Sequence, residues 1–309
     1  FMCNLLIERQ RRFSLDPDSL FAHNPALVHA TLTGYGTTGP DAWRPGYDVT
    51  AFFGRSGLYD ASREGDNGIV PMARPAQGDH TAGLSLLGAI LAALRLAERS
   101  GEGQVVETSL FETAIWTQAT DFGTTVIDGA PVRRRSRHHQ LTPMANRYPC
   151  RDGKWVVFNM LDPDAWPRLC RAIDRAAWID DERYQTPIDR YHCMPELVDG
   201  VDEALSVRSR DEWGEIFDEL GIIWGPVLTL DEVSRDAQAH AIGMFPEIEH
   251  PELGSYRTVN SPFRFKTADV GPKGPAPELA EDTKAVLNQV GFGDAEIDAL
   301  IDQGIVTTR

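Results

Sequence analysis

The chain has 309 residues, of which 42% are hydrophobic and 25% charged, and its formal net charge is −16. This composition excludes a disordered chain, and the acidic balance excludes a general nucleic-acid binder, because phosphate contacts need a concentrated basic surface. An anionic ligand therefore requires a local basic cluster, and two clusters are present, at Arg9, Arg11 and Arg12 and at Arg133, Arg134, Arg135 and Arg137.

The first predicted elements are a helix and a strand. Asp16 before Pro17 has the form of a helix N-cap with proline at the first helical position, so residues 17–23 are predicted to be a short helix. Residues 26–33 form a partly alternating, β-branched run that predicts a strand. The glycine-rich loop 34–40 can bring backbone amides against a phosphate or an acyl group, but a plain turn is an equally good interpretation.

Two further segments separate this loop from the longest apolar stretch. Residues 49–58 predict a helix that Asp48 could cap, and residues 59–68 predict a flexible, charged linker. Beyond the apolar stretch, residues 104–110 alternate and predict a strand, which indicates an α/β unit. The long connection 123–146 is predicted to be irregular, and connections of this length usually bind something or cross between domains.

An acidic residue stands at the start of the longest apolar stretch. Asp79 follows Gly78, and residues 81–98 are small or apolar at nearly every position, which predicts a helix buried on most sides. From spacing alone, Asp79 is best interpreted as the helix N-cap, because aspartate is a favoured cap. The longest apolar run, near residues 84–94, is shorter than the ~20 residues that a membrane span needs.

The second half of the chain predicts a smaller α/β unit. The turn at Asp152-Gly153 predicts an antiparallel hairpin, and Ser209 to Glu212 resembles a capping box. The predicted strands are 154–159, 222–227 and 261–265, the predicted helices are 163–174, 194–205, 213–220, 281–290 and 294–303, and residues 240–262 are predicted to be rich in loops.

Nothing in the sequence predicts a metal site or secretion. The four cysteines, Cys3, Cys150, Cys170 and Cys193, lack metal-ligand spacing and are interpreted as free thiols in a reducing cytoplasm. The N-terminal residues lack the pattern of a signal peptide. Because the chain begins with Phe1 inside an apolar segment, we expect upstream sequence to be missing.

Several motifs follow one another along the chain in a recognisable order. They are LTGYGTTGP at 32–40, RPGYD at 44–48, GDHTAG at 78–83, GEGQVVETSL at 101–110 and GIIWGPVLTLDEV at 221–233. In this order they resemble the class III coenzyme A transferase family, which includes formyl-CoA:oxalate and carnitine CoA-transferases and the related alpha-methylacyl-CoA racemases. The resemblance covers essentially the whole chain and starts partway through the family's large domain.

This resemblance implies an α/β fold. The implied fold has a Rossmann-like large domain with an inserted smaller α/β domain. In the implied assembly, two subunits interlock like links of a chain. The implied division is a large CoA-binding domain at 1–135 without its N-terminal part, a small domain at 136–235, and a return to the large domain at 236–309. A homodimer is the implied assembly, and neither a nucleic acid nor a membrane is an implied partner.

The resemblance also implies roles for single residues. Asp79 matches the aspartate that attacks the acyl-CoA thioester in the transferases, giving a mixed anhydride and then an enzyme-bound CoA thioester. Tyr47 and Asp48 match a catalytic pair that is His-Asp in the racemases. Because a tyrosine is a poor general base at neutral pH, this difference favours a transferase. The implied CoA contacts are Asn4, Leu5, Arg12, Phe13 and Gly36. At the position of Leu5 the family usually has an aromatic residue.

The implied activity is CoA transfer from an acyl-CoA to a carboxylic acid, with CoA thioester as a substrate and with no metal or permanently bound cofactor. An acyl-CoA racemase or epimerase and a non-catalytic CoA-binding fragment stay as alternatives. The tetraglycine loop that covers the aspartate in formyl-CoA transferase is replaced by residues 141–146. The acceptor acid is therefore open, and oxalate is not favoured.

Overall fold

The computed structural model describes residues 1–308 and divides into two compact units, Phe1–Gly225 and Pro226–Arg309. The first unit contains a parallel three-stranded sheet in the order β1-β2-β3, formed by β1 (Met2–Cys3), β2 (Val28–Thr33) and β3 (Gln104–Ser109). The central strand β2 is buried along most of its length, as expected for a parallel strand covered on both faces, whereas β3 alternates between exposed and buried residues. The chain is therefore mixed α/β with a parallel sheet.

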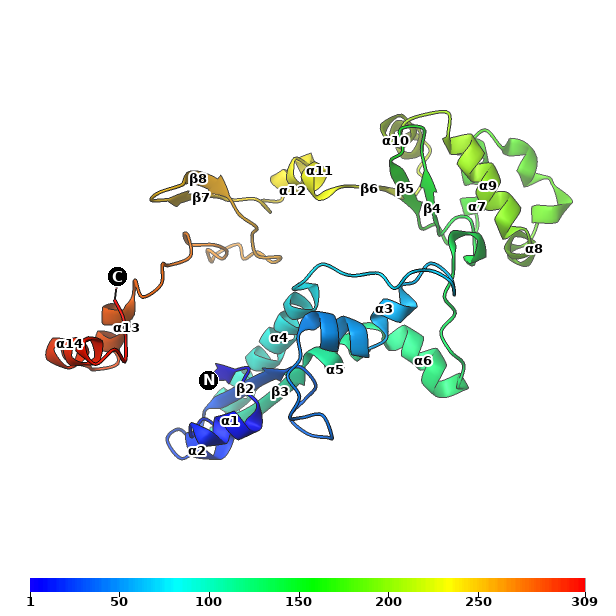
Figure 1. Ribbon diagram of the computed structural model, residues 1–309. Coiled ribbons are helices and arrows are strands. Elements are labelled where there is room, and N and C mark those ends of the chain that lie inside the picture. The colour runs from blue at the N-terminus through cyan, green and yellow to red at the C-terminus, as the bar shows by residue number, and fades with distance from the viewer. Residues whose placement is uncertain (309) are drawn as a thin grey trace. The chain divides into compact units, whose positions relative to one another are not determined.

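Helix α4 (Gln77–Ser100) lies along this sheet, and further helices of the same part of the chain are shown with it in Figure 1. They are α1 (Ile7–Arg12), α2 (Pro17–Phe21), the π-helix Asp48–Arg55, α3 (Leu58–Ala61), α5 (Leu110–Thr117) and α6 (Ala119–Asp128). The predicted cap of α2 is confirmed, because Asp16 accepts a hydrogen bond of 3.2 Å from the backbone amide of Ser19. Ser109 caps α5 in the same way, accepting from the amide of Glu112.

Helix α4 begins earlier than its sequence predicts. Its N-cap is Ala76, which adopts a left-handed φ of 73°, and the helix ends at Gly101 with a φ of 76°. Asp79 thus lies inside the first turn, and its interpretation as the N-cap was wrong. The boundary was missed because Gln77 and Gly78 join the helix instead of ending the preceding turn.

Helix α4 is also far more exposed than predicted. Its buried residues form one narrow stripe, Gly78, Ala82, Leu86, Ala93 and Ala97, while Leu84, Leu87, Leu91 and Leu94 are exposed. The prediction of a helix buried on most sides was wrong for this single chain, because the helix packs on the sheet along one stripe only. Among the helices of residues 1–308, α4 alone is long and apolar enough to cross a membrane, and the core helix of a soluble protein can have the same length and composition.

The segment predicted to be a flexible linker is held by ion pairs. Asp60 and Asp66 both pair with Arg134, at 2.6 and 3.1 Å, and Glu64 pairs with Arg147. The segment also contains α3, so the expectation of an unstructured linker was wrong. The charges that suggested solvation are instead used to join residues distant in the sequence.

The rest of the first unit has its own core. The strands β4 (Arg147–Pro149) and β5 (Trp155–Phe158) pair antiparallel, as predicted. The helices are α7 (Ala165–Ala172), α8 (Pro187–His192), α9 (Met194–Leu205) and α10 (Arg210–Glu219), with short 3-10 helices at Arg137–His139, Ala176–Ile179 and Glu182–Tyr184. Tyr148, Phe158, Trp213 and Phe217 are fully buried in this core, and the rings of Trp213 and Phe217 stack at 5.5 Å.

The second unit differs from its prediction in its strands. After β6 (Trp224–Val227), which spans the boundary between the units, come α11 (Leu230–Ser234), α12 (Ala237–Ala241), β7 (Glu247–His250), β8 (Gly254–Arg257), α13 (Thr283–Gln289) and α14 (Asp294–Asp302). The antiparallel hairpin of β7 and β8 lies in the predicted loop region, and residues 261–265 form no strand. The strand prediction at 261–265 was wrong, since Phe263 and Phe265 stay exposed and contact each other instead of a ladder.

Candidate active site

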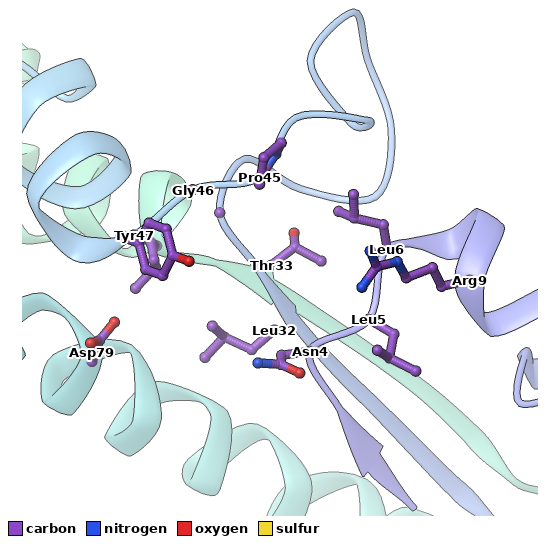
Figure 2. A pocket seen from close by; sticks show the side chains of 12 residues that line it. Asn4, Leu5, Leu6, Arg9, Leu32, Thr33, Pro45, Gly46, Tyr47 and Asp79 are labelled. Atoms are coloured by element: carbon purple, nitrogen blue, oxygen red, sulfur yellow. The ribbon is translucent and has the colours of Figure 1, made fainter.

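A pocket of about 630 Å³ opens where the three parallel strands end. Asn4, Leu5 and Leu6 line it just after β1, Thr33 and Gly34 line it at the end of β2, and Leu110 lines it just after β3. Ligands of parallel α/β proteins commonly bind at the carboxyl ends of the strands. The remaining lining residues are Arg9, Leu32, Pro45, Gly46, Tyr47 and Asp79 (Figure 2).

Gly78 brings Asp79 to the pocket by allowing a close helix contact. A Cβ atom on Gly78 would lie 2.6 Å from Cγ of Phe52 and 3.0 Å from Cβ of Asp48, so only glycine fits where α4 meets the π-helix. Asp79 is the next residue, and its exposed side chain lines the pocket. Figure 2 shows its carboxylate in the first turn of α4, on the same side of the pocket as Tyr47.

A second glycine contact brings Tyr47 to the same pocket. A Cβ atom on Gly34 would lie 2.6 Å from Cα of Gly46, so the loop after β2 and the segment before the π-helix cross with no side chain between them. The carbonyl of Gly34 accepts a hydrogen bond of 3.1 Å from the amide of Phe111, which fixes the loop to α5. Tyr47 directly follows this crossing and is 76% exposed.

The electrostatic surroundings of Asp79 raise its pKa. Although the side chain is exposed, its partial desolvation by neighbouring atoms of the pocket is the largest cause, the negative charge of Asp48 adds to it, and His80 partly opposes both. The Asp79 carboxylate has no hydrogen-bond partner among residues 1–308, so no donor stabilises its charge. A carboxylate of raised pKa and without hydrogen bonds is more basic and hence a better nucleophile.

Asp48 lies behind the pocket wall. It is 4% exposed, its Oδ1 accepts a hydrogen bond of 2.6 Å from the amide of Val49, and its Oδ2 is buried without a described partner. It is the first residue of the π-helix, whose N-cap is Tyr47, so the expectation that Asp48 caps this helix was wrong. Asp48 therefore acts on the pocket through its charge rather than by lining it.

The predicted site residues fall into two groups. Asp79, Tyr47, Asn4 and Leu5 line one pocket, although they lie in different parts of the sequence. The side chains of Arg12 and Phe13 lie outside its lining and contact each other at 5.6 Å, and Gly36 lies outside it with a φ of 98°.

One lining residue was missed by sequence reasoning. Arg9 was noted only as a member of a basic cluster, yet of Arg9, Arg11 and Arg12 it alone lines the pocket. The sequence feature that could have identified Arg9 is its position three residues after the lining segment 4–6, in the first half of α1.

Two of the four arginines in the second basic cluster form ion pairs within the chain. Arg134 pairs with Asp60 and Asp66, and Arg137 pairs with Asp202. Within residues 1–308 no three His, Cys, Asp or Glu side chains are grouped as a metal site. All four cysteines are free, and burial raises the pKa of Cys150 to about 11.

The fold and the pocket define an α/β enzyme with an open carboxylate at the ends of its parallel strands. The chain belongs to CoA-transferase family III, whose sequence pattern matches residues 1–283. The resemblance read from the motifs is thus confirmed, and the protein is a class III CoA-transferase.

Named relatives and a solved structure agree with this assignment. The chain is similar to (R)-2-hydroxy-4-methylpentanoate CoA-transferase of Clostridioides difficile, with 29% identity over 99% of this chain and 76% of the relative. It is 30% identical to cinnamoyl-CoA:phenyllactate CoA-transferase of Clostridium sporogenes, over 93% of this chain and 70% of the relative. A CAIB/BAIF family protein from Brucella suis matches with a TM-score of 0.80 and 26% identity, over 94% of this chain and 74% of that protein.

Proposed function

We propose that the enzyme moves CoA from an acyl-CoA to a carboxylic acid, with Asp79 as the nucleophile. The observation that carries this proposal is the Asp79 carboxylate itself, which lines the pocket at the strand ends and accepts no hydrogen bond from any of residues 1–308. Membership of the family supports the reaction class.

The reaction proceeds by four displacements at carbonyl carbon. An Asp79 oxygen attacks the thioester carbonyl, the C–S bond breaks, and CoA thiolate leaves a mixed anhydride. The thiolate then attacks the Asp79 carbonyl and releases the donor acid, which gives an Asp79–CoA thioester. The acceptor carboxylate displaces the thiolate from this thioester, forming a second anhydride. The thiolate finally attacks the acceptor's acyl carbon and frees Asp79.

Neutral donors in the pocket are proposed to stabilise the oxyanions that form at each step. The hydroxyl of Tyr47 and the side-chain amide of Asn4 both come from lining residues. We propose that Asp48 keeps Asp79 basic through its negative charge. Leu5 is proposed to contact the CoA arm within the pocket, and Arg12, Phe13 and Gly36 to contact CoA beyond it.

We also infer a cytoplasmic homodimer of interlocked subunits, in which the small domain is inserted in the large one. Free cysteines fit a reducing compartment. The exposed leucines of α4 are an apolar surface of the kind that a partner subunit covers.

Trapping with hydroxylamine tests the role of Asp79. The protein is incubated with acyl-CoA and hydroxylamine, and mass spectrometry of peptides is expected to show a hydroxamate at Asp79, because hydroxylamine cleaves activated acyl groups. Asp79→Ala should lower transfer activity on the order of a thousandfold, as for loss of a catalytic nucleophile. The control is Glu98→Gln, an exposed acid near the other end of α4. Unchanged transfer by Asp79→Ala would sink the proposal.

Two alternatives give different results in the same preparations. A racemase would incorporate deuterium at the α-carbon of an acyl-CoA in heavy water without any acceptor acid. A non-catalytic CoA-binding chain would bind CoA without turnover. We expect no deuterium incorporation, because Tyr47 occupies the position at which the racemases carry their histidine base. We expect turnover rather than binding alone, because Asp79 lines the pocket.

A further inference from the structure

Arg9 is the one cationic side chain among the described residues that line the Asp79 pocket. It lies in α1, and Figure 2 places its guanidinium across the pocket from Asp79, near Leu6. Its side chain makes no hydrogen bond or ion pair with any residue of the range 1–308. Arg134, Arg137 and Arg147, by contrast, are each paired with a carboxylate.

An unpaired arginine at this position is informative because the chain is rich in acids. It has 46 acidic against 30 basic Lys and Arg residues, so a guanidinium near a binding surface has many possible partners. A guanidinium presents five N–H donors in a planar fork that matches phosphate and carboxylate oxygens. Arg9 is thus left with its full donor capacity directed at the contents of the pocket.

The position of Arg9 limits which part of a substrate it can meet. The reacting carbonyl has to reach Asp79, so a group beside Arg9 on the opposite side belongs to a remote part of the same substrate. Arg9 is itself exposed, and Leu5 and Leu6, which lie beside it in Figure 2, make the adjoining part of the pocket wall apolar. An anionic oxygen group that reaches this position meets a positive charge that no carboxylate among residues 1–308 neutralises.

We propose that Arg9 binds an anionic oxygen group of the thioester substrate and thereby acts as a specificity-determining residue. This inference rests on the proposed role of Asp79. Two sources supply the same chemistry: a phosphate of CoA, or the second carboxylate of a dicarboxylic acyl group. Both form bidentate, charge-assisted hydrogen bonds with a guanidinium.

The test compares Arg9→Gln, Arg9→Lys and Arg11→Gln. Arg11 lies on the same helix, is exposed and does not line the pocket, so its variant controls for loss of charge on α1. Calorimetry measures the Kd of CoA and of dephospho-CoA, and transfer assays measure KM and kcat with butyryl-CoA and succinyl-CoA. Arg9→Lys keeps the charge but loses the fork, so it is expected to lie between the wild type and Arg9→Gln.

The expected loss in Arg9→Gln is on the order of tenfold to a hundredfold in Kd or KM, with kcat little changed. A weaker Kd for CoA with equal effects on both thioesters identifies a phosphate, and a smaller effect on dephospho-CoA identifies its 3′-phosphate. A higher KM for succinyl-CoA alone identifies a carboxylate. If Arg9→Gln matches Arg11→Gln in every one of these measurements, the inference is overturned.

Hydroxamate trapping separates this inference from the proposed function. Wild-type protein that traps at Asp79 while Arg9→Gln behaves like the control overturns the Arg9 inference alone. Absence of trapping in the wild type overturns the role of Asp79 and the inference with it. Should Arg9→Gln fail to fold, as seen by circular dichroism, Arg9→Lys provides the same comparison.

Discussion

Asp79 is set apart from the other acidic side chains by its surroundings. Hydrogen bonds from serine, threonine or arginine lower the pKa of Asp16, Asp181 and Asp189. Such bonds stabilise a carboxylate and reduce its basicity. Partial desolvation and Asp48 raise the pKa of Asp79 instead, His80 opposes them only through its charge, and no residue in the range 1–308 donates a hydrogen bond to this carboxylate. This difference distinguishes a chemically useful carboxylate from acids that cap helices or pair with arginine.

Removing the charge of Asp48 should shift the pH dependence of the enzyme. In Asp48→Asn the neighbouring negative charge is lost, so the pKa of Asp79 falls and the nucleophile is ionised at lower pH. The acidic limb of the kcat/KM profile is therefore expected to move to lower pH, while the plateau falls because a less basic carboxylate is a weaker nucleophile. The asparagine oxygen can still accept the hydrogen bond from Val49.

The control for this prediction is Asp128→Asn, which removes a charge from the exposed end of α6. Profiles measured across the acidic and neutral range should coincide for this variant and the wild type. An acidic limb that stays in place, or moves to higher pH, in Asp48→Asn would contradict the electrostatic role of Asp48.

At the scale of elements, the start of α4 depends on a glycine that tolerates no side chain. In Gly78→Ala the added Cβ would lie 2.6 Å from Cγ and 2.7 Å from Cβ of Phe52, so the first turn of α4 has to move. We expect a loss of about 1–3 kcal/mol in the free energy of unfolding, which is typical of overpacking. Transfer activity should fall as well, because Asp79 moves with this turn.

Gly83→Ala is the matched control for this prediction. Gly83 lies in the same helix, and a Cβ added there meets nothing within 4 Å. This variant should gain about 0.5–1 kcal/mol from reduced backbone freedom and keep its activity. Urea denaturation and transfer assays measure both effects, and equal behaviour of the two variants would rule out the close contact at Gly78.

Elements with strong local signals were predictable from the sequence. Asp16-Pro17 located α2, Ser209 with Glu212 located α10, and the turn at Asp152-Gly153 located the pairing of β4 with β5. The β7–β8 hairpin was missed, although its turn is short and ends at Gly254, which has a φ of 71°. The exposed face of α4 was missed because apolar composition does not say what covers a helix.

Part of the candidate site could be predicted in the same way. Asn4 follows β1, while Asp79 and Tyr47 lie in motifs of the family, and the structure gathers these residues around one pocket. Arg9 could not be chosen over Arg12, because the choice depends on how α1 is rotated against the sheet. Side-chain direction on a short helix is set by tertiary packing, which spacing alone does not specify.

At the scale of the whole molecule, apolar surface is left uncovered on the longest helix. The exposed fractions of Leu84, Leu87, Leu91 and Leu94 range from 39% to 58%. Their spacing of three and four residues places them along one side of α4. Contiguous apolar surface of this kind marks interaction sites in soluble proteins. It supports the proposed homodimer without specifying its geometry.

A charge placed in this row of leucines should disrupt the proposed dimer. Leu91→Asp puts a carboxylate on a side chain that is 58% exposed in the single chain, so folding should tolerate it, whereas burial in an interface would leave the charge unpaired at high cost. Sedimentation velocity is expected to show a wild-type dimer and a largely monomeric variant at micromolar concentration. Leu161→Asp is the control, because Leu161 is 78% exposed and lies outside α4. A Leu91→Asp variant as dimeric as the Leu161→Asp control would place the subunit contact elsewhere, and a monomeric wild type would remove the dimer altogether.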